Sequence, residues 1–247
     1  MKKIITLALA VMVACSAASA QLCSTKEGQK FTYRQTETKE KKELVSTSTV
    51  VKVETAADGV VSVRMEDKTT DPSDPMHDQT MFSGYRFNPA DTTTTNIIMG
   101  ADDFKEFIIG MIKQGAEAAG QFVSDAQMAE VEKMVKVSGE MALPLNPNAV
   151  AGQTFSNSTL RCTMGPQSMK LLLCKGKYQG REEIEVPAGK FNCVKVEYQV
   201  RSTGMGPDTP DQYVTAWYAD GIGMVKQIDA DKKGNVRSEQ VLTAISE

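Results

Sequence analysis

The acidic residues around the only histidine are the first candidates for a chemical site. Asp71, Asp74, His77 and Asp78 fall within one short, proline-punctuated stretch. Aspartate and histidine are common metal ligands, but the spacing of these four residues matches no defined coordination geometry. A single histidine in a loop also provides no Ser-His or Cys-His relay. The pattern favours a solvated acidic loop, and we predict no metal site and no catalytic residue here.

A second acidic motif lies near the C-terminus. Asp229-x-Asp231 begins like a calcium-binding loop, whose later ligands are oxygen atoms at fixed positions. Lys233 occupies the fifth position, and Gln240 occupies the twelfth, where a bidentate glutamate is needed. The motif therefore predicts the turn of a hairpin. Because no other set of residues has catalytic spacing, we predict a protein that is not an enzyme and has no cofactor.

The N-terminus has the pattern of a secretory signal peptide. Lys2 and Lys3 precede an apolar run from Ile4 to Val13, and Ala18-Ser19-Ala20 forms an Ala-x-Ala cleavage site. The apolar run is too short for a membrane-spanning helix. We predict cleavage after Ala20, export to the periplasm or outer envelope, and no transmembrane segment in the mature chain. The alternative is a lipoprotein acylated at Cys15, with a poorer match in the preceding residues.

The overall charge excludes some partners. The formal net charge is −3, and no block of basic residues follows the N-terminal segment. A surface without a basic patch is not typical of proteins that bind nucleic acid or anionic membranes. We therefore predict no nucleic-acid partner, and the protein partner stays unidentified.

Four cysteines follow the predicted signal peptide, and an even number in an oxidising compartment suggests disulfides. Cys162 and Cys174 flank a candidate turn at Gly165–Ser168, so they are one candidate pair across two strands. Cys23 and Cys193 would then form the other pair. Free buried thiols are the alternative, and the direction of the Cys193 side chain stays open.

Most of the chain alternates between apolar and polar residues, which is typical of strands that are buried on one face. Strands are expected at 29–38, 45–53, 61–65, 158–164, 168–175, 178–186, 191–202, 212–219, 222–229 and 235–245. Short strands joined by turns favour an antiparallel meander. We predict one mainly β domain over residues 21–247, built as a single bent sheet.

The register of one hairpin can be predicted in detail. Matching the apolar faces pairs Val53 with Val63 and Val51 with Met65, because a shift by one residue would turn every valine to the other face. This register leaves the three-residue loop Ala57–Gly59, in which Gly59 suits the left-handed position.

A helical period interrupts the strands at about 101–138. Apolar residues recur every three or four positions, and Ser124 and Gln127 form a capping-box pattern before the second helix. Stripes of this kind usually pack on a sheet. The alternative hypothesis makes the helical pair a lid over a ligand, with the candidate ligand-binding residues Phe104, Phe107, Ile108, Met111, Met128 and Met134.

Two strings in the second half of the chain resemble a known family. They are Val186-Pro187-Ala188-Gly189-x-Phe191-x-Cys193-x-Lys195-Val196 and Trp217-Tyr218-Ala219-x-Gly221-Ile222-Gly223-x-Val225. The chain is similar here to the TapB-like exported proteins of Bacteroidetes, which belong to a broader domain of unknown function. The resemblance implies a curved antiparallel sheet or half-barrel like that of the periplasmic lipoprotein carriers. It implies no established activity, and no motif residue carries a catalytic role.

These observations lead to two hypotheses of different kinds. The first is a non-enzymatic exported protein that binds a lipid or another small apolar molecule in the concave face of its sheet. The second is a structural or protein-interaction module of the cell envelope with a filled core.

Overall fold

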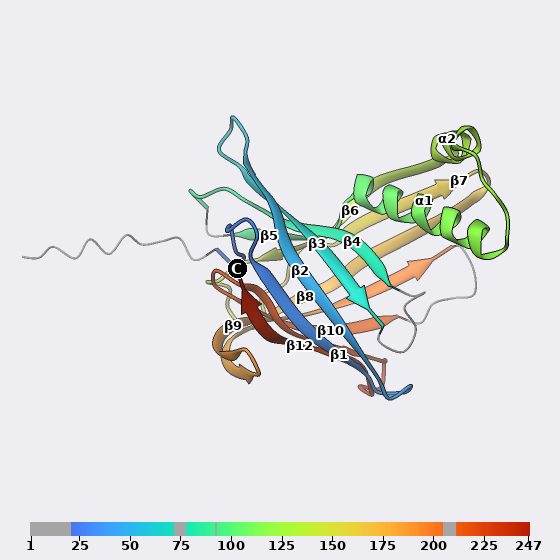
Figure 1. The fold of residues 1–247 in the computed structure, drawn as a ribbon. Helices are drawn as coiled ribbons and strands as arrows, with labels where there is room; N and C mark the ends of the chain where they lie inside the picture. Colours follow the sequence, from blue (N-terminus) through green and yellow to red (C-terminus); the bar gives the residue numbers. More distant parts are fainter. Residues whose placement is uncertain (1–20, 72–77, 92, 205–210) are drawn as a thin grey trace, which may run out of the picture.

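The computed structural model describes residues 21–71, 78–91, 93–204 and 211–247. These residues form mainly antiparallel strands, with two helices inserted between β5 and β6 (Figure 1). In chain order the elements are β1 (Lys30–Glu37), β2 (Lys42–Thr55), β3 (Val61–Thr70), β4 (Gln79–Phe87), β5 (Thr94–Met99), α1 (Ala101–Ala118), α2 (Asp125–Met134), β6 (Val135–Leu145), β7 (Ser158–Met164), β8 (Gln167–Val186), β9 (Gly189–Thr203), β10 (Gln212–Ala219), β11 (Gly223–Ala230) and β12 (Val236–Ser246).

The sheet closes on itself, so the expected curved sheet or half-barrel is wrong. Each strand pairs with its neighbours in sequence, and β1 also pairs with β12 in antiparallel register from Lys30 opposite Ser246 to Glu37 opposite Ser238. Closure gives both outer strands a hydrogen-bonded partner and removes the two edges that an open sheet would leave. The result is a closed barrel of twelve strands.

The β2–β3 hairpin confirms one predicted pair and corrects the other. Val53 lies opposite Val63, and Gly59 has a φ of +84° in the turn. Met65, however, lies opposite Val50, because a bulge shifts the register between Val50 and Lys52. The bulge leaves Val50 1% exposed inside the barrel and Val51 42% exposed outside. An extra residue of this kind cannot be read from the apolar alternation alone.

All four described cysteines are buried free thiols, so the predicted disulfides are absent from the described residues. Cys162 lies opposite Met169 and Cys174 lies opposite Gln199, which places the first candidate pair out of register with each other. The other candidates, Cys23 and Cys193, are also free and buried, and Cys193 is fully enclosed. Burial raises the pKa of Cys23 and of Cys193 to about 12.

The helices lie against the outside of the barrel, where α1 contacts β4 and β6. Phe104 is the buried residue of α1, and the Arg64 guanidinium of β3 donates to Asp103 Oδ1 at 2.7 Å. The predicted capping box is confirmed, since Ser124 N donates to Gln127 Oε1 at 2.9 Å and Gln127 N donates to Ser124 Oγ at 3.4 Å. The insertion is shorter than expected, because β6 begins at Val135.

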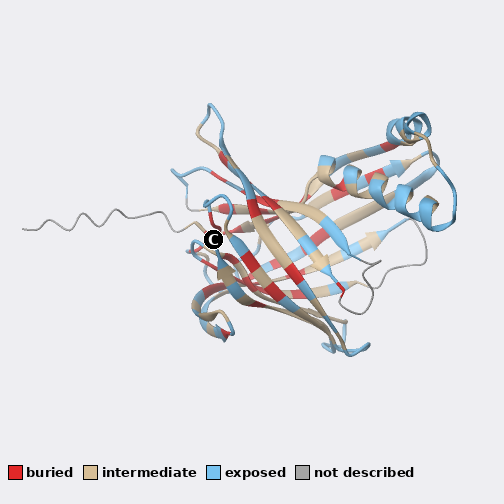
Figure 2. Ribbon diagram, in the orientation of Figure 1, coloured by how far each residue is buried: buried red, intermediate tan, exposed pale blue. Residues whose placement is uncertain are grey.

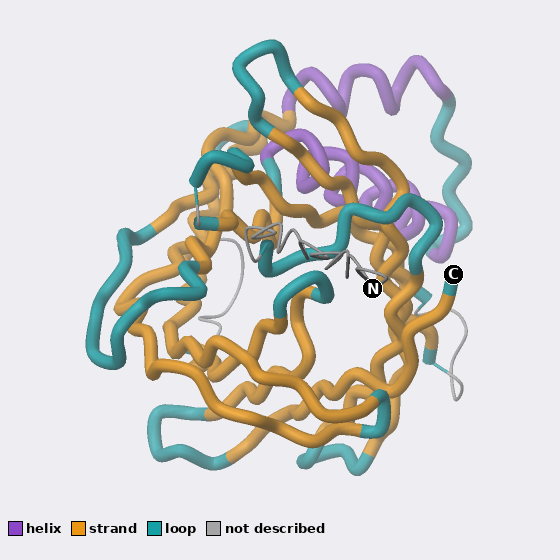
Figure 3. The backbone as a smooth tube through the Cα atoms, turned by 90° about the vertical axis from the view of Figure 1, so that its left-hand side faces the viewer, coloured by secondary structure: helices purple, strands orange, loops and turns teal. Residues whose placement is uncertain are grey.

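Much of the helical surface faces water (Figure 2). In contrast, the segment before β1 enters the barrel, and Leu22 is 0% exposed. Leu22 N donates to Thr94 Oγ1 at 3.3 Å, and the carbonyl of Gln21 accepts a hydrogen bond from Gly221 N at 2.7 Å. Figure 3 looks onto this end, where loops lie within the ring of strands. We call the segment Gln21–Gln29 the N-terminal plug.

Candidate functional site

The barrel interior contains a partly open cavity of about 500 Å³, and this cavity is the strongest candidate site. It is lined from every strand except β7, by side chains that reach from the plugged end toward the end that carries the helices. The lining residues are Phe31, Tyr33, Gln35, Ser46, Ser48, Met65, Asp67, Thr69, Ser83, Tyr85, Asn96, Ile98, Met99, Met141, Leu171, Tyr198, Val200, Gln212, Val214, Tyr218, Ile222, Met224, Gln227, Asp229 and Gln240.

The polar lining residues are gathered on one side of the barrel. Nine of them come from the six neighbouring strands β11, β12, β1, β2, β3 and β4, and we call this set the polar wall. Its members are Gln227, Asp229, Gln240, Gln35, Ser46, Ser48, Asp67, Thr69 and Ser83. Several are bonded to one another, as where Gln240 Nε2 donates to Ser46 Oγ at 2.9 Å.

The opposite side is mostly apolar, and we call it the apolar wall. It consists of Ile98, Met99, Met141, Leu171, Val200 and Val214, from β5, β6, β8, β9 and β10. Its aliphatic side chains and methionines offer a surface that adapts to the shape of an apolar group. Apolar side chains are thus denser on one side of the cavity and hydrogen-bonding groups on the other, although Phe31, Met65 and Met224 lie on strands of the polar wall and Asn96 and Gln212 lie on strands of the apolar wall.

Asp67 and Asp229 are the two carboxyl groups of the polar wall. The hydroxyl groups of Ser48 and Ser83 donate to Asp67, the latter at 2.5 Å. Ser238 Oγ donates to Asp229 Oδ2 at 3.0 Å. Burial raises the pKa of both carboxyl groups above the usual range, because removal from water disfavours the charged form.

Four tyrosines lie deeper in the cavity and add hydroxyl groups to it. Tyr33 Oη donates to the carbonyl of Met224 at 2.9 Å. Asn96 Nδ2 donates to Tyr218 Oη at 3.1 Å, and Tyr198 is hydrogen-bonded to the same hydroxyl. Burial raises the pKa of Tyr218 to about 12 and that of Tyr85 well above its usual value. These phenols stay protonated at neutral pH, and no described lining residue is basic.

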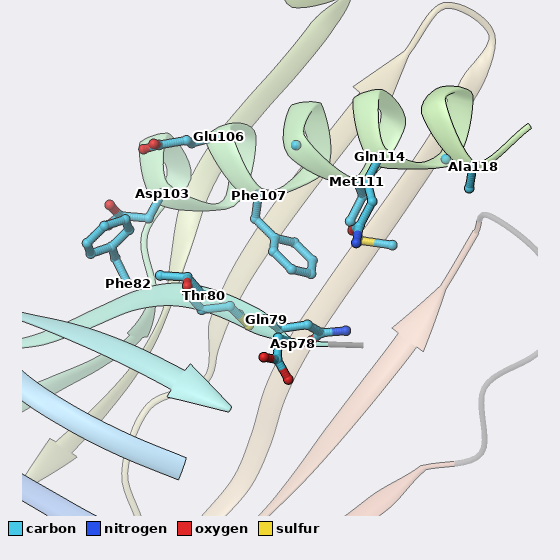
Figure 4. A pocket seen from close by; sticks show the side chains of 13 residues that line it. Asp78, Gln79, Thr80, Phe82, Asp103, Glu106, Phe107, Met111, Gln114 and Ala118 are labelled. Atoms are coloured by element: carbon cyan, nitrogen blue, oxygen red, sulfur yellow. The ribbon is translucent and has the colours of Figure 1, made fainter. Parts of the chain in front are cut away.

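A second, more open groove of about 800 Å³ runs between α1 and β4 (Figure 4). Of the six predicted ligand-binding residues, only Phe107 and Met111 line it. Phe104 is buried beneath the helix, and Ile108 packs against the core. Met128 and Met134 line neither this groove nor the barrel cavity. Asp78, Asp103 and Glu106 contribute carboxyl groups to the groove, which is the more open of the two sites.

The acidic stretch near the histidine is only partly visible. Asp71 is buried and forms an ion pair with Lys42, and Asp71 N donates to Asp78 Oδ1 at 3.1 Å. Asp74 and His77 lie outside the described residues. Among the residues that the structure describes, no three His, Cys, Asp or Glu side chains are placed to hold a metal ion.

The C-terminal acidic motif is the predicted hairpin turn, between β11 and β12. Asp231 Oδ1 accepts hydrogen bonds from Lys233 N at 2.7 Å and Asn235 N at 3.0 Å, so the carboxylate is used within the turn. The side-chain amide of Asn235, which donates to Asp231 Oδ2 at 2.8 Å, and these backbone bonds lower the pKa of Asp231.

The sequence analysis does not place Asp67 or Asp229 in a cavity, although the strand pattern contains the signal for Asp67. Val61, Val63 and Met65 share a face of β3, and continuing this alternation turns Asp67 and Thr69 inward too. A carboxyl group on the inward face of a strand indicates that the interior is not filled by apolar side chains alone. For Asp229, the resemblance to a calcium loop drew attention to the turn instead.

None of the helices in the described ranges is both long and apolar enough to cross a membrane.

Two crystal structures share the fold. A candidate lipoprotein from Parabacteroides distasonis superposes with a TM-score of 0.64 at 17% identity, over 92% of this chain and 99% of its own. A candidate exported protein with a YmcC-like fold from Bacteroides fragilis gives a TM-score of 0.62 at 18% identity, over 92% and 100% of the two chains. No curated protein matches the sequence. Residues 115–242, more than half of the chain, match the DUF3108-like family, and the protein belongs to that family.

Proposed function

We propose that this protein is an exported, non-enzymatic binding protein that holds one small amphipathic or largely apolar molecule inside its barrel. The observation that carries the proposal is the partly open cavity of about 500 Å³ between an apolar wall and a polar wall. Cavities of roughly 300–1,000 Å³ with apolar surfaces and a few directed polar groups are the usual form of small-molecule sites. The interior is therefore suited to binding a small molecule.

Export is supported by the sequence of residues 1–20 and by the solved structures that share the fold, one of them a candidate exported protein. The resemblance to the TapB-like proteins of Bacteroidetes points the same way. We expect the mature N-terminus at Gln21. N-terminal sequencing and intact-mass measurement of the protein recovered from cell envelopes test this prediction. A lipid-modified N-terminus at Cys15 would contradict cleavage after Ala20 and show that the protein is a lipoprotein.

The ligand is best sought without assuming its identity. Protein purified from its native envelope is extracted with organic solvent, and the extract is compared by mass spectrometry with that of a cavity-filling variant. Val214→Phe directs a larger side chain into the cavity, whereas Thr215→Phe places the same ring on the opposite face of β10. We expect one stoichiometric compound with the wild type and Thr215→Phe, and its loss with Val214→Phe. Equal recovery from all three proteins would contradict binding in the barrel.

The groove between α1 and β4 is a second candidate location for an apolar molecule, favoured by Phe107 and Met111. It ranks below the barrel because Met111 is half exposed and the groove is the more open of the two sites. Phe107→Ser should leave recovery of the extracted compound unchanged if the ligand lies in the barrel, and should abolish it if the ligand lies under the helix.

A protein-interaction module is the second candidate function, and the helical insertion favours it. Phe122, between the two helices, is 92% exposed, and Met134 at the end of α2 is also exposed. Exposed apolar side chains can take part in a contact surface, and these two flank opposite ends of α2. Cross-linking in intact cells would support this function if a partner were trapped from the insertion and lost with Phe122→Ser, while the barrel ligand remained bound.

A further inference from the structure

We propose that the ligand of the barrel carries a cationic group, such as a protonated amine, at one end of an apolar body. This inference rests on the proposed function and adds the chemical class of the ligand. It is carried by the placement of two carboxyl groups, Asp67 and Asp229, in the wall of a cavity whose described lining contains no lysine, arginine or histidine.

The first step is the charge of the cavity. Asp67 lies on β3 and Asp229 on β11, with β2, β1 and β12 between them, so they are separate groups of one wall. Their recorded side-chain partners are serine hydroxyls and, for Asp229, the amide of Gln227. These partners donate hydrogen bonds but bring no positive charge; Arg237, which is not among the lining residues, acts on Asp229 only through its electrostatic field. A carboxyl group withdrawn from water either takes up a proton or gains an opposite charge that offsets the lost hydration, and a cationic ligand would supply that charge.

The second step is the rest of the lining. The other members of the polar wall are uncharged amides and hydroxyls, and the buried tyrosines remain neutral. A ligand with a carboxylate or phosphate head would bring a further negative charge into this environment. An ammonium group supplies three donors, which matches a wall that is rich in carboxyl, amide and hydroxyl oxygens.

The third step is the position of the charges relative to the apolar surface. Val214 lies directly opposite Asp229 on the paired strand, and it belongs to the apolar wall. Asp67 is two positions from Met65 on the same inward face of β3. Each carboxyl group therefore borders apolar surface, so that a cationic head and an apolar chain of one molecule are accommodated side by side.

Decylamine, decanol and decanoate share the same unbranched ten-carbon skeleton and differ in the charge of the head group. Titrating each by calorimetry, below its critical micelle concentration, separates the effect of head-group charge on affinity from that of apolar burial. We expect decylamine to bind about tenfold or more tightly than decanoate, because charge-assisted hydrogen bonds are among the stronger polar interactions. Asp67→Asn and Asp229→Asn should each weaken decylamine binding severalfold and leave decanol binding within about twofold.

The matched control is Glu66→Gln, which removes one negative charge from the residue beside Asp67, where Glu66 pairs with Lys68 at 2.8 Å. An equal loss of decylamine binding in Glu66→Gln and Asp67→Asn would mean general attraction to an acidic surface and would overturn the proposal. Binding of decanol or decanoate as tightly as decylamine would overturn the cationic class but keep the barrel as a binding site. Binding of none of the three, with no extracted compound, would overturn both.

Discussion

The two ends of the barrel differ in the residues that occupy them. At one end the N-terminal plug inserts Leu22 and Cys23 into the core, and backbone groups of the plug bond to β2 and to the β10–β11 turn. At the other end polar residues such as Thr69 and exposed Gln212 line the cavity near the ends of their strands. One end therefore stabilises the barrel, whereas the other leaves its cavity accessible to a ligand.

The largest effect is expected where the plug is deepest. Leu22→Ala removes a fully buried side chain, and a change of this type costs about 2–5 kcal/mol of unfolding free energy. Chemical denaturation monitored by circular dichroism gives the value. A loss below about 0.5 kcal/mol would mean that the plug is dispensable, and the contrast between the two ends would fail.

A second substitution at the same end tests the close packing of Gly223 against the Tyr85 side chain. Gly223 has a φ of +105°, and a Cβ there would lie 2.6 Å from Tyr85 Oη. Gly223→Ala should therefore lower the unfolding free energy by about 1–3 kcal/mol, through backbone strain and overpacking. The double variant with Tyr85→Phe removes that hydroxyl and should recover part of the loss. No recovery would show that backbone strain alone is responsible.

Inside the cavity we expect a substitution that stabilises the folded protein, in contrast to the two destabilising substitutions at the plugged end. Burial raises the pKa of Asp67 in the folded protein, whereas an unfolded aspartate titrates near about 3.9. The folded state therefore loses stability as pH rises from that value through the raised pKa, and the penalty is absent below both values. Asp67→Asn removes it, so the melting temperature should rise by a few degrees at pH 7.

The same variant should change little near pH 3, where Asp67 is protonated in both states. Thermal melts at the two pH values test this, with Glu66→Gln as the control for a charge that is paired with Lys68. A stabilisation of equal size at both pH values would show that the effect does not come from ionisation.

The smallest effect is expected on the helical insertion. Phe122 is 92% exposed, so Phe122→Ser should alter the unfolding free energy by less than about 0.5 kcal/mol. The same denaturation experiment measures it. A clear destabilisation would mean that the helical insertion stabilises the barrel. The two ends of the barrel would then differ less in their contribution to stability than the burial of their residues indicates.

Much of the fold could be predicted from the sequence, because strand formation depends on local alternation. The Val53–Val63 register, the Gly59 turn and the Ser124 capping box all involve residues close in sequence. Closure of the barrel could not be predicted, since it depends on pairing Lys30 with Ser246. The same alternation on these two strands would suit the edges of an open sheet.

The candidate site was harder to predict for a related reason. The helical stripe was a strong local signal, but its Phe104 packs onto the barrel and its Met111 faces largely outward. The cavity exists only after closure, when residues of distant strands such as Asp67 and Asp229 line one space. Local patterns give the face on which a side chain lies, and the topology then decides whether that face encloses a cavity or a filled core.

The meander has a consequence for how the molecule assembles. Among the strands that the structure describes, eleven pairs join neighbours along the chain, and only the β1–β12 seam joins the first strand to the last. Neighbouring hairpins form by short loop closures, whereas the seam must bring together segments separated by nearly the whole chain. We therefore expect the ring to grow by successive hairpins and to be completed at the seam, so that the ligand-holding interior exists only once assembly is finished.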